Sequence, residues 1–321
     1  MAETASSIDN AYSSPGVLMN DNYPDVLDAR FKSISRLPWA RPVQGLRHFK
    51  QINTNRAYEK FSNVAGGGML SKARDVDAMP LIDVIQGYDI TAAPEEYKAG
   101  IRIGKRLRET DQYNVIDQHM LDLNESVRET IEQYAALPYN EAFGTSTWLC
   151  GDGMYLVDAE RPFPDNGVSG TWGNLETGSD LTQGAIETMR LNFRKHYDER
   201  GRRAPLVLKK LVVPPDLEST ANVQLDTKKK SGGALNDVSE LNKFGISSEV
   251  WDYLTDTNAW FGFAMEPGDS KFEIQWLWGV RPNFEPYTIT DNPDVYGYRA
   301  RMVFVTCARA AHALRGNAGA S

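Results

Sequence analysis

The residues able to perform acid–base or metal chemistry lie far apart in this sequence. The four histidines, His48, His119, His196 and His312, do not form the HExxH pair that binds zinc on a helix. His119 precedes Asp122 by about one helical turn, and we interpret it as a partly buried histidine bonded to that neighbour rather than as a general base. No Gly-x-Ser-x-Gly segment occurs, which argues against the serine nucleophile of α/β-hydrolases. The sequence therefore predicts no catalytic residues and no metal site.

Two further patterns lack the residues that their chemistry requires. Val64–Met69 contains three consecutive glycines, but the next residues are Leu-Ser-Lys instead of the Gly-Lys-Ser/Thr of a phosphate-binding loop. Cys150 and Cys307 are the two cysteines, and without a CxxC spacing they indicate neither a zinc site nor a disulfide framework. We expect both to be small, buried, apolar side chains in a reducing compartment. We also expect no cofactor.

The composition is that of a globular protein with a substantial core. The chain has 321 residues, of which 41% are hydrophobic and 24% are charged, and this length suffices for one large or two ordinary domains. No apolar run approaches the ~18 residues that cross a bilayer, and the N-terminus has no secretory signal. The formal charge of −8 argues against a protein that works by covering phosphates with Lys and Arg.

Residues 1–50 are predicted to form an arm. Serines and prolines interrupt this segment, and it shows no sustained periodicity, so it cannot bury enough surface to fold alone. Aromatic residues nevertheless recur along it: Tyr12, Tyr23, Phe31, Trp39 and Phe49. We expect the arm to be ordered by lying across another surface, because a disordered tail, the alternative, would carry fewer aromatic residues.

Residues 51–104 are predicted to form a β-arm. Leu81–Ile85 and Tyr97–Ile103 have the composition of strands. Gly87–Pro94 between them is expected to be an extended, turn-rich connection. Such an arm is marginally stable alone in water and needs neighbours to pack on.

The longest periodic element spans about residues 111–137 and is predicted to be a helix about 40 Å long. Its apolar residues recur three or four positions apart, on one helical face: Ile116, Met120, Leu123, Val127, Ile131 and Tyr134. Charged residues fill the other positions: Asp117, Asp122, Glu125, Arg128, Glu129 and Glu132. Thr110 or Asp111 is the expected N-cap, and Pro138 is the expected stop. We interpret this helix as a structural spine.

A second helix is predicted at about residues 181–200. Its expected N-cap is Ser179 or Asp180, and Gly201 is its expected end. The residues expected to face inward are Ala185, Ile186, Met189, Phe193 and Tyr197.

An apolar strand, Leu206–Val213, is predicted after this helix. It is bounded by prolines and is apolar on both faces, apart from two lysines, so we expect it to be central in a small sheet covered by helices. Pro214 cannot donate to a ladder, and Pro215 suits the first turn of a helix that we expect to reach about Leu225.

Strand signals dominate from residue 246 onward. The predicted strands are Val250–Leu254, Ala259–Met265, Phe272–Gly279 and Val295–Cys307. Lys228–Gly233 and Asn283–Pro293 are predicted to be loops. The basic run of Lys228–Gly233 could touch nucleic acid, but we interpret it as a solvated loop.

Four segments resemble the major capsid proteins of tailed bacteriophages of the Hong Kong 97 type. They are the strand that ends in Val-Val-Pro-Pro-Asp-Leu-Glu (212–218), the run Thr255–Phe261, the strand Arg299–Cys307, and the closing Arg-Gly-Asn-Ala-Gly (315–319). The resemblance extends over most of the chain and rests on the order and spacing of these segments.

The resemblance implies an α+β, Hong Kong 97-like capsid fold. Its parts would be an N-terminal arm (1–50), an extended β-hairpin loop (51–104), a peripheral domain with the spine helix (105–144 and part of 246–300), and an axial domain (145–245 and 300–321). Capsomers of this family meet at their axes through loops of the axial domain, for which Lys228–Gly233 and Asn283–Pro293 are the candidates here.

The resemblance also implies a function: a major capsid protein, not an enzyme, that self-assembles as pentamers and hexamers into an icosahedral head enclosing double-stranded DNA. The expected location is the virion capsid, after assembly in the host cytoplasm. Expected partners are other copies of the chain, a portal, a scaffolding protein, decoration proteins and non-specifically contacted DNA, without a membrane. No charged helical leader is present, so we expect a separate scaffold or a leader already removed. The covalent crosslink of the type member cannot be carried over.

Two alternatives remain open at this point. An encapsulin, a bacterial shell around cargo enzymes, would resemble the same fold but would begin with a short helix, and residues 1–50 lack helical periodicity. A glycosidase is the alternative enzyme, because acidic residues are abundant and seven tryptophans could line a sugar cleft.

Overall fold

The computed structural model describes most of the chain that follows the N-terminal segment. The described residues are 42–65, 69–70, 72–75, 79, 81–82, 84–104, 106–107, 115–144, 148–165, 167–226, 241–269, 271–288 and 295–320. The predicted arm up to residue 41, the predicted N-caps Thr110 and Asp111, and the predicted loop Lys228–Gly233 lie outside these residues.

Strands make up most of the regular structure in this part of the chain. In chain order the elements are η1 (Gly45–His48), β1 (Lys50–Asn53), β2 (Glu59–Ala65), β3 (Ile85–Ala92), β4 (Glu95–Gly104), α4 (Val115–Asn140), β5 (Arg161–Pro162), β6 (Thr171–Trp172), α5 (Gln183–Arg194), β7 (Lys210–Val213), η2 (Pro215–Leu217), α6 (Glu218–Asp226), η3 (Leu241–Phe244), β8 (Ser247–Val250), β9 (Trp260–Phe263), β10 (Ile274–Thr288), β11 (Val295–Ala308) and β12 (Leu314–Asn317).

The chain folds into two compact units. The first contains Glu96–Glu129 and Val280–Val303, and the second contains Val43–Glu95, Thr130–Gly279 and Phe304–Ser321. In the first unit Ile103, Ile116, Met120 and Tyr298 form a buried apolar cluster. A four-stranded sheet has the strand order β1-β10-β11-β4.

The second unit is built around a four-stranded sheet with the order β12-β9-β7-β8. β7 lies inside this sheet, parallel to β8 and antiparallel to β9, and its last three residues are completely buried. The prediction of a central strand is therefore confirmed, with a later start than the pattern indicated. Pro214 and Pro215 end β7, and η2 and α6 follow, as predicted.

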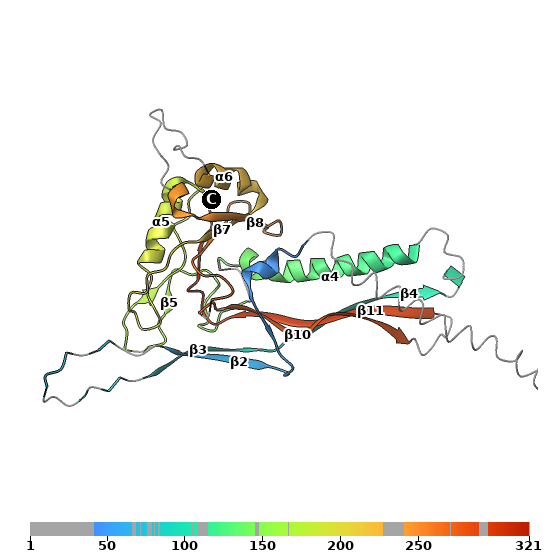
Figure 1. Cartoon of the computed structure of the whole chain (residues 1–321), viewed down its shortest axis with the longest axis horizontal. Helices are drawn as coiled ribbons and strands as arrows, with labels where there is room; N and C mark the ends of the chain where they lie inside the picture. The colour runs from blue at the N-terminus through green and yellow to red at the C-terminus, as the bar shows by residue number, and fades with distance from the viewer. Residues whose placement is uncertain are drawn as a thin grey trace, which may run out of the picture. The chain divides into compact units, whose positions relative to one another are not determined.

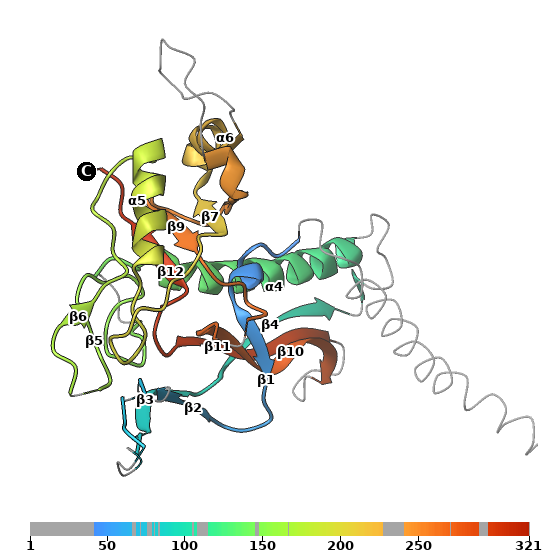
Figure 2. The same cartoon turned by 60° about the vertical axis from the view of Figure 1, so that its left-hand side comes forward.

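Helices α5 and α6 flank this sheet (Figure 2). Ile186, Met189 and Phe193 of α5 share a core with Ala221 and Leu225 of α6 and with apolar residues of β7. The interior therefore sits between the two helices and the strands that they cover.

The predicted bounds of α5 are wrong at both ends. Thr182 is the N-cap, and its Oγ1 accepts a hydrogen bond from the Ala185 amide at 3.2 Å. The helix ends at Arg194, because the chain then folds back so that the Ala204 amide donates to the His196 carbonyl at 2.9 Å. Gly201, with φ of +66°, serves this turn instead of ending the helix, and Tyr197 is 38% exposed.

The long helix α4 has the predicted apolar stripe, which is buried from Ile116 to Ile131, whereas Tyr134 is 37% exposed. Pro138 does not end the helix as predicted. The Glu141 amide still donates to the Leu137 carbonyl at 3.1 Å, and the buried Tyr139 ring packs edge-on against Phe49 and other aromatic rings. The packing of this last turn offsets the backbone hydrogen bond that is lost because proline has no N–H group.

Two of the charged side chains that fill the positions outside the apolar stripe of α4 are buried. Glu132 is fully buried because its carboxylate accepts the amides of Gln44 and Gly45, the latter at 2.9 Å. Arg128 is 3% exposed, and its Nε donates to Glu125 at 2.6 Å. His119, in contrast, is exposed rather than partly buried.

β2 and β3 form a long antiparallel hairpin (Figure 1). The predicted strand at Leu81–Ile85 is displaced, since β3 begins at Ile85 and includes most of the residues expected to be a turn-rich connection. The strand predicted at Tyr97–Ile103 is confirmed as β4. It pairs with β11, not with the hairpin.

The C-terminal strands are largely confirmed as β9, β10 and β11. The strand predicted at Val250–Leu254 is wrong beyond Val250, because the Leu254 amide closes a turn on the Trp251 carbonyl at 3.3 Å. β12 was not predicted. Its four residues include Arg315 and Gly316, which carry little β propensity, yet all four are buried.

Replacement of Ile131 by alanine tests the buried stripe of α4. Ile131 has no exposed surface, so Ile131→Ala should lower the free energy of unfolding by about 2–5 kcal/mol. Leu121→Ala on the same helix is the matched control, because Leu121 is 45% exposed. This substitution should change the free energy of unfolding by no more than about 0.5 kcal/mol. Urea unfolding measures both, and equal effects would contradict the burial of this face.

Candidate assembly surfaces and polar clusters

The far end of the β2–β3 hairpin carries an exposed apolar surface, which we call the tip surface. It comprises Met69, Leu70, Met79, Leu81 and Val84, each at least 71% exposed. Exposed apolar side chains gathered in one segment mark interaction sites in soluble proteins. The tip surface can therefore bind an apolar partner surface.

The base of the hairpin, in contrast, is held by polar contacts within the second unit. Asn63 donates to the Glu199 carboxylate at 2.8 Å, and Arg309 donates to the Ser62 carbonyl at 3.4 Å. An ion pair between Lys60 and Asp89 joins the two strands. The hairpin is thus fixed at one end and presents apolar residues at the other.

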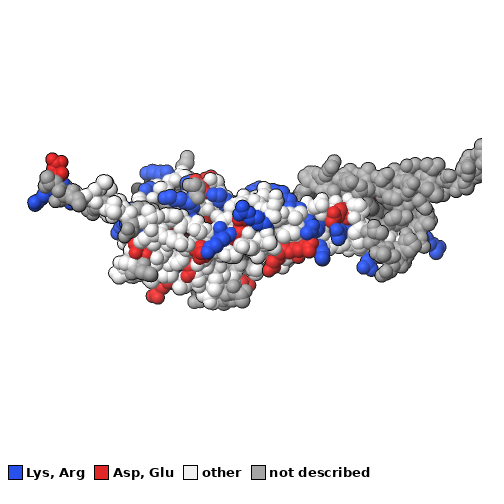
Figure 3. Space-filling model, turned by 90° about the horizontal axis from the view of Figure 1, so that it is seen from below, with Lys and Arg blue, Asp and Glu red and all other residues white. Residues whose placement is uncertain are grey.

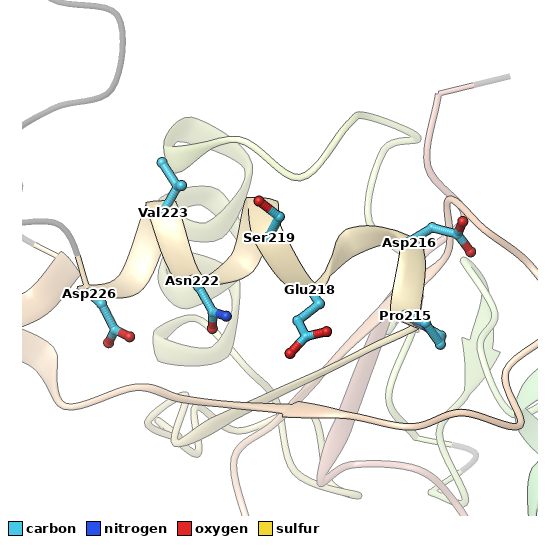
Figure 4. A pocket seen from close by; sticks show the side chains of 7 residues that line it. All are labelled: Pro215, Asp216, Glu218, Ser219, Asn222, Val223 and Asp226. Atoms are coloured by element: carbon cyan, nitrogen blue, oxygen red, sulfur yellow. The ribbon is translucent and has the colours of Figure 1, made fainter.

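A shallow acidic groove of about 560 Å³ runs along α6. Glu218, Asn222 and Asp226, four residues apart, project from the same side of the helix (Figure 4). Asn222 accepts a hydrogen bond from Ser248 of β8 at 3.3 Å. The groove has the chemistry of a contact for basic groups, and the described residues that line it include no histidine, cysteine or basic side chain that could serve as a catalytic partner.

His48 is a buried structural residue. Its ring lies 4.6 Å from that of Trp251 and 5.7 Å from that of Phe263, and Lys210 Nζ donates to its Nδ1 at 3.4 Å. Burial, and then the positive charge of Lys210, lower the pKa of His48 to about 3. The folded protein therefore holds a neutral imidazole here.

The fold brings together two histidines that the sequence separates. His196 Nε2 lies 2.9 Å from His312 Nδ1, and the His312 ring stacks on Trp172 with centroids 4.1 Å apart. Burial lowers the pKa of both rings, that of His196 to about 4. No local spacing indicated this pair, because the α5–β7 connection and the approach to β12 meet only in the folded chain.

A buried carboxylate lies beside this pair. Glu273 accepts a hydrogen bond from Arg309 at 3.1 Å. Burial raises the pKa of Glu273 to about 7, and the negative charge of Glu199 acts in the same direction, whereas Arg309 lowers it. Neither Glu199 nor Glu273 stands out in the sequence, since the abundant surface carboxylates have the same local pattern.

The two cysteines are free and buried, as predicted. Burial raises the pKa of Cys150 to about 11 and that of Cys307 to about 12, so both are thiols at neutral pH and poor nucleophiles.

A buried arginine organises the segment between α4 and α5. Arg161 has no exposed surface. It pairs with Asp152 at 2.6 Å and donates to the Asn174 side chain at 3.2 Å and to the Leu156 carbonyl at 3.2 Å. Asn174 also donates to the Leu314 carbonyl at 3.2 Å, which connects this segment to β12.

The C-terminal Arg315-Gly316-Asn317 run has a structural role in the same region. Arg315 pairs with the buried Glu176. A Cβ on Gly316 would lie 2.6 Å from a Val157 methyl group, so a larger residue cannot fit without movement. Asn317 accepts a hydrogen bond from the Ser179 amide at 3.1 Å.

The two loops predicted to lie at the capsomer axis are Lys228–Gly233 and Asn283–Pro293. Lys228–Gly233 lies outside the described residues, as stated above. Of Asn283–Pro293, residues 283–288 are not a loop but part of β10 in the first unit, and the rest lies outside the described residues.

Charges of both signs are scattered over the face shown in Figure 3, with no continuous basic stripe among the described residues that it displays. Within the described residues, the longest helices are too short or too polar to span a bilayer.

Comparison with solved structures identifies the fold. The chain is similar to the capsid of the cyanophage P-SCSP1u (TM-score 0.57, 10% identity, covering 89% of this chain and 90% of that chain). It is also similar to a structure of Microbacterium phage Oxtober96, with a TM-score of 0.54 and 10% identity, covering 88% of this chain and 92% of that chain. The SrpI encapsulin of Synechococcus elongatus PCC 7942 is similar with a TM-score of 0.53 and 10% identity, covering 88% of this chain and 90% of that chain. A search of curated proteins finds no match.

The fold is therefore the α+β, Hong Kong 97-like fold of shell-forming proteins, as predicted. A sequence model of the phage capsid protein family matches residues 87–314, which is most of the chain. The chain belongs to this family and is a major capsid protein, a structural component of the virion capsid that assembles with copies of itself into a shell.

The neutral state of His48 generates a pH-dependent prediction. The unfolded imidazole titrates near 6.5 and the folded one near 3, so stability is complete above pH 6.5 and falls as the pH drops toward 3. Near pH 5, protonation of the His48 imidazole in the unfolded chain should have lowered the free energy of unfolding by about 2 kcal/mol. Between about pH 7.5 and pH 5, the free energy of unfolding of His48→Gln should therefore fall by about 2 kcal/mol less than that of the wild type, as measured by urea unfolding.

His119→Gln is the matched control for this measurement. Because His119 is exposed on α4, its replacement should leave the pH dependence of the wild type unchanged. Identical pH dependence in the wild type and His48→Gln would show that His48 is not the group responsible.

Proposed function

We propose that this major capsid protein assembles as rings of five and six into an icosahedral head that encloses double-stranded DNA. The tip surface of the β2–β3 hairpin carries the proposal. A subunit that exposes Leu70 at 87% and Leu81 at 88% can bury these side chains against another copy of the chain. Each fully buried leucine would contribute roughly 1.5–3 kcal/mol to that contact.

Different parts of the fold are proposed to have different roles in assembly. Residues 51–104 would supply the extended loop, 105–144 and part of 246–300 the peripheral domain, and 145–245 with 300–321 the axial domain. The acidic groove of α6 would then meet basic groups of a neighbouring copy near the capsomer axis. Loops there can rearrange between rings of five and six, whereas the packed β12-β9-β7-β8 sheet cannot.

Contact with DNA is proposed to be weak and non-specific. The charge of −8 and the scattered basic residues favour loose, salt-sensitive contact over a tight complex. A portal, a separate scaffolding protein and decoration proteins remain proposed partners, with assembly in the host cytoplasm. The proposed role requires no active site, metal or cofactor for shell formation.

Substitution of the tip surface tests the proposed contact. Leu70→Glu and Leu81→Glu should leave the melting temperature of the free subunit unchanged, because both side chains are exposed. Both should abolish or strongly reduce particle formation, because burying an unpaired carboxylate is costly. Electron microscopy and velocity sedimentation measure the particle yield.

Gln86→Glu is the matched control, since Gln86 is exposed on β3 of the same hairpin and the change adds the same charge without removing apolar surface. It should assemble like the wild type. Normal particles from both leucine variants would exclude the tip surface as an assembly contact.

An encapsulin-like shell is the second candidate, because the fold is also similar to the SrpI encapsulin. The content of particles from the native source distinguishes the two. Nuclease-protected double-stranded DNA is expected, and particles that contain a cargo enzyme and no DNA would favour the encapsulin function.

A further inference from the structure

Three potential metal ligands converge in the second unit, beside the base of the β2–β3 hairpin. Glu199, Glu273 and His312 each place one ligand atom within 4.8 Å of the other two. They come from three separate segments: the α5–β7 connection, the residue preceding β10, and the approach to β12.

The three side chains line a cavity of about 580 Å³. Its wall also includes Asn63 and Val64 of the hairpin, and the segment His196–Arg200. Glu199 and His312 are partly exposed whereas Glu273 is buried, so a small ion could enter from the side of Glu199. The cavity is large enough for an ion together with several water molecules.

The imidazole is arranged to bind a cation. His312 Nδ1 is engaged with His196 Nε2 at 2.9 Å, which leaves Nε2 of His312 as the ligand nitrogen. A hydrogen bond at the other ring nitrogen is the usual support of a metal-bound histidine, because it fixes the tautomer and the ring orientation. Stacking on Trp172 holds the ring in the same position.

Each carboxylate also retains an oxygen for a ligand. Glu199 accepts the hydrogen bond of Asn63 on Oε1, and Glu273 accepts that of Arg309 on Oε1. At Oε2 of Glu273, the hydrogen bond found among the described residues is the long one from the His312 amide, at 3.5 Å. Arg309 pairs with Glu273 and Arg202 with Asp198, and Arg200 and Lys271 also line the cavity. The two carboxylates would therefore hold a cation by direct coordination and not through an overall negative charge of the cavity.

We propose that Glu199, Glu273 and His312 form a binding site for one divalent transition-metal ion of the Zn²⁺ type. Nitrogen together with two carboxylates suits Zn²⁺, whereas Ca²⁺ and Mg²⁺ prefer six or more oxygen ligands. Ligand atoms around tetrahedral zinc lie about 3.3 Å apart, as its bond lengths imply. Adjustment of the partly exposed Glu199 side chain brings the three groups to that spacing, and water completes the coordination.

The site would stabilise the base of the hairpin. Glu199 holds Asn63 of β2, and a Cβ on Gly87 of β3 would lie 3.2 Å from the same carboxylate. A metal ion bound by Glu199, Glu273 and His312 would therefore restrain both hairpin strands relative to the segments that precede β10 and β12. This effect does not depend on what the shell contains.

Metal titration of the purified full-length chain, after EDTA treatment and dialysis, tests the proposal. Isothermal titration should show one Zn²⁺ per chain, Mg²⁺ should not compete at the same concentration, and Co²⁺ should give a visible d–d absorption band. Zinc should raise the melting temperature to a plateau. It should also slow amide hydrogen exchange in β2 and β3.

Glu199→Gln and His312→Gln should each weaken zinc binding by about tenfold or more. Glu199→Gln is informative even if His312→Gln is unstable, because Glu199 is partly exposed. Glu266→Gln is the matched control, since that carboxylate is 72% exposed outside the cluster and its loss should not alter binding. The absence of saturable binding in the wild type, or equal affinity in all three variants, would overturn the proposal.

Discussion

The second unit depends on the burial of one ion pair, Arg161 with Asp152. The chain from α4 to α5 contains only two short strands among its described residues, so it lacks the ladder of hydrogen bonds that would otherwise fix it. Arg161 replaces that ladder by donating to side chains and carbonyl groups of the segment. Removing one partner of such a buried pair costs about 3–5 kcal/mol, because the other charge is left without compensation.

This buried network connects to the sheet through β12. Asn174 reaches the Leu314 carbonyl, and Glu176 pairs with Arg315, so an irregular segment and the C-terminal strand hold each other in place. Gly316 allows their close approach, since Val157 occupies the space of a Cβ. The result is a core that is fixed by the subunit alone. The tip surface of the hairpin, by contrast, is exposed among the described residues and is available for burial in an assembly.

The sequence predicted what local patterns determine and missed what distant contacts determine. The stripe from Ile116 to Ile131 and the Pro-bounded strand before Pro214 follow from periodicity and backbone chemistry, and both are confirmed. Pro138 failed as a helix stop because the packing of Tyr139 overrides a local signal. β12 and the cluster of Glu199, Glu273 and His312 were missed for a related reason. Their residues acquire a role only when segments far apart in the chain meet, and no single-sequence spacing records that meeting.

The central claim is that the subunit leaves the β2–β3 hairpin tip unburied until other copies cover it. Hydrogen exchange measured on free subunits and on assembled particles tests this claim most directly. The amides of Met69, Leu70 and Leu81 should exchange rapidly in the free subunit and be strongly protected in particles, while those of β7 are protected in both. Equal protection of the tip in the two states would contradict the account, because the exposed apolar residues would then have no role in forming the shell.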